Sequence, residues 1–202
     1  MRIVSAQEQE KWLEDGQVLE KDSRGPKVLL LEDGLILKIF HTRRHVLLNR
    51  LTPPAQVFSR NGEILANSGI CVPEIVETFW LDKDKGLSAC RYRPLPGESI
   101  ESLFKRNSQQ IEPLLPDLAT FIALLHREGI YFRSLHLGNI LQLPDGRFGL
   151  IDFLDLRKKR RRLTQGEIKR NFMHLSNYLD RRKLEAFPLQ RLIDCYENCA
   201  SQ

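Results

Sequence analysis

The first half of the chain alternates between apolar and polar positions in the way that strands do. Residues 17–40 alternate in this way, interrupted by a polar turn at 22–26 and by the hairpin signal Asp33-Gly34. This spacing predicts three antiparallel strands. Further along, the apolar spacing predicts a helix at 53–68 and strands at 74–81 and 87–92.

A Pro/Gly cluster at 94–97 ends the strand-rich part, and the apolar spacing beyond it is mostly helical. Apolar residues at helical intervals run from Ile100 to Leu125 and stop before Gly129. Short extended blocks are predicted at 140–143 and 148–153, and closing helices at 168–179 and 184–198. Strands first and helices second indicate an α+β fold.

Composition agrees with one packed domain. The chain has 202 residues, of which 42% are hydrophobic and 28% charged, and this excludes a disordered chain. We expect a single domain over 1–202, with a strand-rich lobe at about 1–95, a hinge at 93–97 and a helical lobe at 98–202. No apolar run is long enough to span a membrane and no signal-peptide core is present, so we expect a cytoplasmic protein with reduced cysteines.

The net charge of +5 suggests an anionic partner such as nucleic acid, a phosphorylated sugar or an anionic membrane face. Most of the excess lies in one basic run: Arg157, Lys158, Lys159, Arg160, Arg161 and Arg162. Two interpretations are open. The run is a solvated loop face, or it is an anion-binding patch.

The segment 132–139 carries the most specific chemical signal. It reads F-R-S-L-H-L-G-N, and Asp152 follows Asn139 by thirteen positions within I-D-F. Protein kinases have H-R-D-L-x-x-x-N, then D-F-G, preceded by a lysine on the third strand. Arg133 and Asn139 fall in register with that pattern, and Lys38 lies on the third predicted strand.

Phosphoryl transfer needs these residue types for a physical reason. A protein that transfers a γ-phosphoryl group mainly positions phosphates and offsets charge. Lys38 is expected to serve as the cation, and Asn139 and Asp152 as oxygen ligands of the metal. The pattern therefore predicts ATP with Mg²⁺ or Mn²⁺ as cofactors.

With these motifs in place, the sequence resembles the lipopolysaccharide core kinases, which phosphorylate heptose and Kdo, and the related small bacterial toluene-tolerance proteins. The resemblance covers roughly 17–198 and is most specific at 22–40, 58–73 and 126–157. It implies a protein-kinase-like bilobal fold with a reduced helical C-lobe. It also implies an ATP-dependent phosphotransferase acting on a lipid-linked sugar at the cytoplasmic face of the inner membrane.

The chain departs from that family at three places. Ser134 stands where the family has its catalytic aspartate, and a serine hydroxyl cannot accept a proton as a carboxylate does. The glycine-rich loop is reduced to 23–26, with Gly25 as its glycine and with Lys27 or Arg24 as the expected phosphate contact. Glu63 is the candidate partner of Lys38, although the neighbouring Gly62 weakens a helix there.

Two residues are candidates for the missing base. His136 can titrate near neutral pH, or it can be structural. Asp155 can bind a second metal or orient a hydroxyl, or it can cap the next segment.

Three functions stay open: an active envelope kinase, a pseudokinase that binds ATP as a scaffold, and a nucleic-acid-binding protein. The last has only charge in its favour, so no specific nucleic acid is expected. The acceptor is expected to be a glycolipid or a phosphorylated sugar, with the basic run contacting the anionic membrane.

Overall fold

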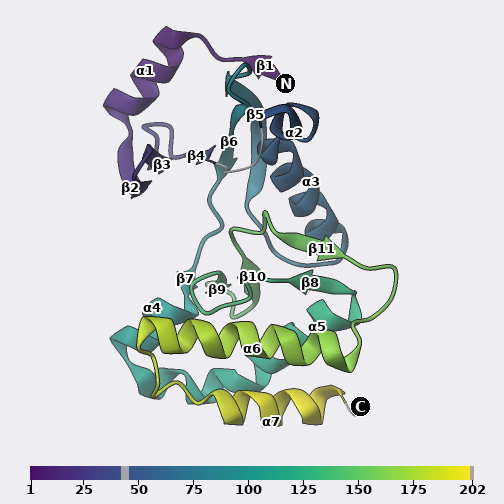
Figure 1. Ribbon diagram of the computed structural model, residues 1–202. Helices are drawn as coiled ribbons and strands as arrows, with labels where there is room; N and C mark the ends of the chain where they lie inside the picture. Colours follow the sequence, from purple (N-terminus) through teal and green to yellow (C-terminus); the bar gives the residue numbers. More distant parts are fainter. Residues whose placement is uncertain (42–45, 201–202) are drawn as a thin grey trace. The chain divides into compact units, whose positions relative to one another are not determined.

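The protein has an α+β fold, seen in a computed structural model that describes residues 1–41 and 46–200. The chain divides into two compact units (Figure 1). The N-terminal unit comprises Met1–Ala66 and Val72–Leu95, and the C-terminal unit comprises Asn67–Cys71 and Pro96–Gln202. The break after Leu95 falls within the Pro/Gly segment 93–97; that this segment acts as a hinge stays a prediction.

The N-terminal unit is built on a six-stranded sheet in the order β1-β5-β6-β4-β3-β2. Its neighbouring strands are antiparallel except for β1, which lies parallel to β5. The strands predicted at 17–40, 74–81 and 87–92 are confirmed. The strand bounds are β1 (Arg2–Ile3), β2 (Gln17–Asp22), β3 (Gly25–Leu30), β4 (Ile36–Phe40), β5 (Glu74–Asp82) and β6 (Leu87–Arg93).

Helix α1 (Ala6–Asp15) covers the apolar cluster on one face of this sheet. Trp12 packs on Phe79 with ring centroids 5.1 Å apart, among the buried side chains of Leu29 and Leu37. The apolar spacing did not predict α1, in which Trp12 is the only buried residue. Ser5 caps the helix by accepting a hydrogen bond from the Glu8 N–H.

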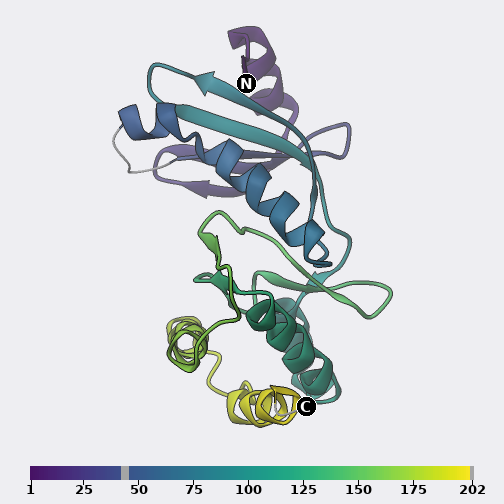
Figure 2. The same ribbon diagram turned by 90° about the vertical axis from the view of Figure 1, so that its right-hand side faces the viewer.

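Helix α3 (Pro54–Asn67) lies along the other face of the sheet (Figure 2). Phe58 joins the two, with its ring 5.5 Å from Phe40 and 6.1 Å from Tyr92. The helix predicted at 53–68 is thus confirmed, and Gly62 does not interrupt it. A short helix, α2 (Val46–Leu51), precedes it.

The C-terminal unit combines helices with two small antiparallel sheets, β7-β9-β10 and β8-β11. Helices α5 and α7 pack against each other. The elements are β7 (Glu98–Ser99), α4 (Ile100–Arg106), 3₁₀ turns at Ser108–Gln110 and Glu112–Leu114, α5 (Leu115–Arg127), β8 (Ile130–Phe132), β9 (Ile140–Gln142), β10 (Phe148–Leu150), β11 (Leu156–Lys158), α6 (Gln165–Arg182) and α7 (Leu189–Ala200).

Three sequence predictions in this unit need correction. The last helix begins at Leu189 instead of 184, because the residue before Pro188 is disfavoured in helical conformation and Lys183 ends α6 with a left-handed backbone. The strand predicted at 148–153 ends at Leu150, before the backbone turns at Asp152. The basic run is not simply a loop, since Arg157 and Lys158 belong to β11.

None of the helices within residues 1–41 and 46–200 is both long enough and apolar enough to cross a membrane.

Candidate functional site

The loop at 133–139 is fixed by its apolar residues and presents its polar ones. Leu135 and Leu137 are fully buried, whereas Ser134 before them and His136 between them are partly exposed. The start of the loop is tied to α6, because the Asn171 side chain donates a hydrogen bond of 2.9 Å to the carbonyl of Phe132. The two leucines and the hydrogen bond to α6 thus anchor the loop, in which Ser134 and His136 stay partly exposed and Asn139 is buried.

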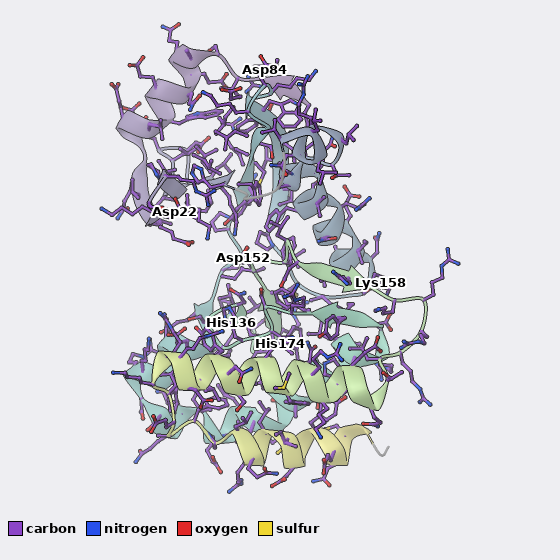
Figure 3. All side chains as sticks on the ribbon, viewed as in Figure 1. Asp22, Asp84, His136, Asp152, Lys158 and His174 are labelled. Carbon is purple, nitrogen blue, oxygen red and sulfur yellow. The ribbon has the colours of Figure 1, made fainter. Side chains whose placement is uncertain are left out.

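The fold brings the two predicted metal ligands to the same end of the β9–β10 hairpin. Ile140 pairs with Leu150 at the end of this ladder. One step further, the Ile151 N–H donates to the Asn139 carbonyl at 3.0 Å, so Asn139 and Asp152 lie on adjacent segments. Figure 3 labels Asp152 together with His136 in this unit.

The backbone at Asp152 is unusual. Its φ angle is 53°, in the left-handed region that residues other than glycine seldom adopt. Such conformations persist where the surrounding structure constrains them, and they cluster at active sites and ligand clamps. This outlier singles out Asp152 independently of the sequence motif.

Ser134, at the position where the resemblance leads us to expect a catalytic aspartate, is hydrogen-bonded to a carboxylate from another segment. The Ser134 hydroxyl donates a hydrogen bond of 2.9 Å to Oδ2 of Asp155, and the Asn139 side chain donates to the Ser134 carbonyl at 3.1 Å. Oδ1 of Asp155 is buried and has no hydrogen-bond partner in the described part of the chain. Burial raises the pKa of Asp155, and the hydrogen bond from Ser134 only partly opposes this shift.

His136 is held by a network that the sequence did not reveal. Its ring stacks on that of Tyr178 with centroids 4.0 Å apart and planes 4° apart. The Tyr178 hydroxyl donates a hydrogen bond to Glu101, a buried carboxylate that also forms ion pairs with Lys105 at 2.5 Å and Arg182 at 3.0 Å. Burial lowers the pKa of His136, so its imidazole is neutral at pH 7.

The Leu-Gly-Asn part of the loop motif contained a signal for that network. A Cβ atom at Gly138 would lie 2.9 Å from the Tyr178 hydroxyl and 3.0 Å from Oε2 of Glu101. Only glycine therefore lets this network approach the loop backbone so closely. Tyr178 and Glu101 themselves lie 40 positions after and 37 positions before Gly138, too far for sequence spacing to indicate contact.

In the N-terminal unit, Lys38 occupies a buried position on β4 and is only 5% exposed. It pairs across the sheet with Cys90, and its Nζ lies 5.4 Å from the centre of the Phe58 ring. Burial raises the pKa of the Cys90 thiol to about 12, although the nearby ammonium group of Lys38 opposes the shift. Cys90 is consequently a protonated packing residue.

Glu63 is not brought to Lys38. The α3 residues that face the sheet are Phe58, Asn61 and Leu65, whereas Glu63 lies on the exposed side. It forms no salt bridge among residues 1–41 and 46–200. Two positions along a helix correspond to about 200° of rotation, so a helix that buries Asn61 turns Glu63 toward solvent.

Gly25 and Lys27 lie at the β2–β3 turn. Gly25 has a φ angle of 121°, and the turn is closed by the Arg24 N–H donating to Asp22 at 2.8 Å. Lys27 forms an exposed ion pair with Glu20 at 2.6 Å. Val28, not Lys27, pairs with Lys38, and strand alternation places the Lys27 side chain on the opposite face of the sheet.

The basic run is partly neutralised. Lys158 interacts with Glu128, and Lys159 and Arg161 both reach Glu167. Arg161 holds the pKa of Glu167 far below its usual range. Arg157, Arg160 and Arg162 are exposed and form no ion pairs within the described residues. The charge available to an anionic partner is thus smaller than the sequence suggests.

No group of three or more His, Cys, Asp or Glu side chains that could hold a metal occurs in the described part of the chain. Asn139 and Asp152 fit a different kind of site, because Mg²⁺ commonly takes one or two carboxylates and completes its shell with water and phosphate oxygens.

No protein-family model matches this chain, and no curated protein is significantly similar to it. Its function is therefore inferred from its own residues and their geometry.

Proposed function

We propose that this protein is an ATP-dependent phosphotransferase with a protein-kinase-like bilobal fold. Its acceptor is a hydroxyl group of a glycolipid or phosphorylated sugar at the cytoplasmic face of the bacterial inner membrane. The observation that supports the proposal best is the hydrogen bond from Ser134 to Asp155 beside Asn139 and Asp152. The loop lacks the expected catalytic acid. The hydrogen bond from Ser134 supplies a carboxylate from another segment, that of Asp155, in its place.

Each residue has a role in this proposal. Asn139 and Asp152 hold Mg²⁺ or Mn²⁺, which when bound neutralises charge on the phosphates of ATP. Lys38 is the cation for those phosphates. Asp155 accepts the proton of the acceptor hydroxyl, and a pKa raised by burial makes its carboxylate a stronger base than an exposed aspartate.

Three other residues position Asp155, favour its ionised form or lie next to it in the loop. Ser134 positions the carboxylate through its hydrogen bond. Arg133, whose charge favours the ionised form of Asp155, keeps that carboxylate available. His136 is a positioning residue, because its ring is stacked on Tyr178 and its imidazole is neutral. Gly25 belongs to the turn proposed to face the phosphates, and Lys27 beside it stays a predicted phosphate contact. Glu63 has no assigned role, since it lies on the exposed side of α3.

Thermal unfolding with nucleotide tests the binding part of the proposal. Mg-ATP at about 100 times its Kd should stabilise the protein by about 2.7 kcal/mol through mass action. Asp152→Ala should abolish this gain. Asp145→Ala is a matched control, because Asp145 lies in the same hairpin but is exposed and paired with Arg147. If neither ATP nor GTP with Mg²⁺ or Mn²⁺ raises the melting temperature, the nucleotide site is refuted.

Transfer is tested separately with truncated lipopolysaccharide cores. Incubation with ATP and Mg²⁺ should add the mass of one phosphate to the acceptor. Nucleotide binding without any transfer would favour the second candidate, a pseudokinase that uses ATP as a structural ligand. That candidate is supported by Ser134 itself, which cannot act as the base.

A further inference from the structure

Glu101 is a buried carboxylate to which the proposed function assigns no role. It lies in the first turn of α4 and is only 6% exposed. Burying a carboxylate is unfavourable unless hydrogen bonds and opposite charges compensate it. Burial alone would raise the pKa of Glu101, but hydrogen bonds from Lys105 and Tyr178 and the charge of Arg182 outweigh it and lower the pKa. The side chain is therefore a carboxylate anion held in one place by three partners.

The backbone of Glu101 holds the loop at 133–139 directly. The first N–H groups of a helix have no partner within that helix. At α4, the Glu101 N–H donates instead to the carbonyl of Leu137 at 3.1 Å. Leu137 is fully buried, and two residues later the Asn139 N–H donates to the His136 carbonyl at 2.9 Å. The start of α4 thus fixes the loop backbone next to Asn139.

The side chain of Glu101 reaches the same loop together with Tyr178. The Tyr178 hydroxyl donates a hydrogen bond to Oε2 of Glu101, and the Tyr178 ring is stacked on that of His136. Both polar groups lie against Gly138, where a Cβ atom would be 2.9 Å from the hydroxyl and 3.0 Å from Oε2. The carboxylate and the phenol therefore contact the loop at the residue directly before Asn139.

We propose that Glu101 is a positioning residue for the metal ligand Asn139 and that it acts through Leu137 and Tyr178. The inference rests on the proposed function, in which Asn139 holds Mg²⁺ or Mn²⁺. The NH₂ group of Asn139 donates to the Ser134 carbonyl, so the amide oxygen is the atom that this side chain offers to a metal. Its direction depends on the loop backbone that Glu101 fixes.

Two variants test the side-chain contacts of Glu101. Glu101→Gln removes the charge and keeps the backbone N–H, and Tyr178→Phe removes the hydroxyl and keeps the ring that stacks on His136. Titration of Mn²⁺ into the full chain with ATP, followed by EPR, should show about 10–100-fold weaker metal binding in each variant, as is typical when a group that orients a metal ligand is replaced. Without metal or nucleotide, the NMR signals of the Asn139 side-chain amide should shift in both variants.

Tyr196→Phe is the matched control, because it removes a tyrosine hydroxyl of the same unit that lies 2.9 Å from Nδ1 of His126. It should leave the Mn²⁺ affinity and the Asn139 signals unchanged. Unshifted Asn139 signals or unchanged Mn²⁺ affinity in both test variants, or equal effects in the control, overturn the inference. If Glu101→Gln does not fold, Tyr178→Phe decides by the same criteria.

Failure of the inference can be distinguished from failure of the proposed function. In the first case the unmodified chain binds Mn²⁺ with ATP, and the two variants bind it equally well. In the second case the unmodified chain binds no Mn²⁺, and the role of Asn139 as a metal ligand is refuted with it.

Discussion

The hydrogen bond between Ser134 and Asp155 allows the two residues to be tested against each other. Asp155→Asn should lower phosphoryl transfer by about 10²–10⁴-fold and leave nucleotide binding unchanged, because it removes the base alone. Ser134→Asp should also slow transfer. The Ser134 hydroxyl now donates a hydrogen bond of 2.9 Å to Asp155, so a carboxylate at position 134 would lie beside that of Asp155 and the two negative charges would repel each other. Faster turnover in Ser134→Asp would show instead that the native site lacks a base.

The thermal stability of the protein provides a second test of the role of Asp155. The raised pKa means that the folded state favours the protonated carboxyl, so burial of the charged form costs stability above that pKa. Asp155→Asn should therefore raise the melting temperature at pH 7. A marked decrease would mean that Asp155 is a structural cap and not a functional carboxylate.

His126 joins three helices and should make the protein sensitive to acid. Its Nδ1 lies 2.9 Å from the Tyr196 hydroxyl on α7, and its Nε2 lies 3.1 Å from Oδ1 of Asn171 on α6. Burial lowers the pKa of His126 to about 4, below its value of about 6.5 in an unfolded chain. Protonation thus favours the unfolded state, so stability is complete above pH 6.5 and is lost as the pH falls toward 4.

Urea unfolding at two pH values measures this effect. The free energy of unfolding should be about 2 kcal/mol lower at pH 5 than at pH 7 through His126 alone. His126→Gln should remove most of this difference, and the remainder includes His136 and the carboxylates with lowered pKa such as Glu167, which act in the same direction. Equal pH dependence in the variant and the unmodified protein would contradict the assignment.

At the scale of elements, the C-terminus of α5 depends on one close approach. Gly129 follows α5 with a φ angle of 68°, and a Cβ atom there would lie 2.2 Å from the Arg161 carbonyl and 2.8 Å from that of Lys159. The Lys159 N–H also donates to the Gly129 carbonyl at 2.7 Å. The segment that carries the basic charges is therefore packed against the end of α5.

Gly129→Ala should destabilise the protein by at least about 2 kcal/mol, because both the backbone angle and the neighbouring carbonyls oppose a side chain. Gly166→Ala is the matched control. Gly166 lies in the first turn of α6 with open space around it, and alanine there should be neutral or stabilising by up to about 1 kcal/mol. Similar midpoints in urea for Gly129→Ala and the unmodified protein would refute the packing argument.

At the scale of the whole molecule, the net charge of +5 is concentrated in the basic run. We predict that Arg157, Arg160 and Arg162, which form no ion pairs within residues 1–41 and 46–200, contribute most of the run's attraction to anionic lipid, at about 1 kcal/mol each. Replacing these three by serine should weaken vesicle flotation at low salt more than replacing Lys158, Lys159 and Arg161, whose charges already interact with Glu128 and Glu167. Equal effects of the two triple variants would contradict this division.

The sequence determined most of the elements, because their signals are local. Period-two alternation and the Asp33-Gly34 turn predicted β2, β3 and β4, and helical spacing predicted α3, α5 and α6. The motif spacing also singled out Asn139 and Asp152, which the β9–β10 ladder places on adjacent segments. Helix α1 was missed, since one buried tryptophan gives no periodic pattern.

Only the tertiary structure decided which polar groups meet, because those contacts join segments that are distant in sequence. It paired Ser134 with Asp155 across 21 positions and placed Tyr178 against Glu101 across 77. It also places Glu63 on the exposed side of α3. Half of the basic run forms ion pairs with Glu128 and Glu167. Spacing along the chain reports which face of an element is apolar, whereas partners across the fold are fixed by packing.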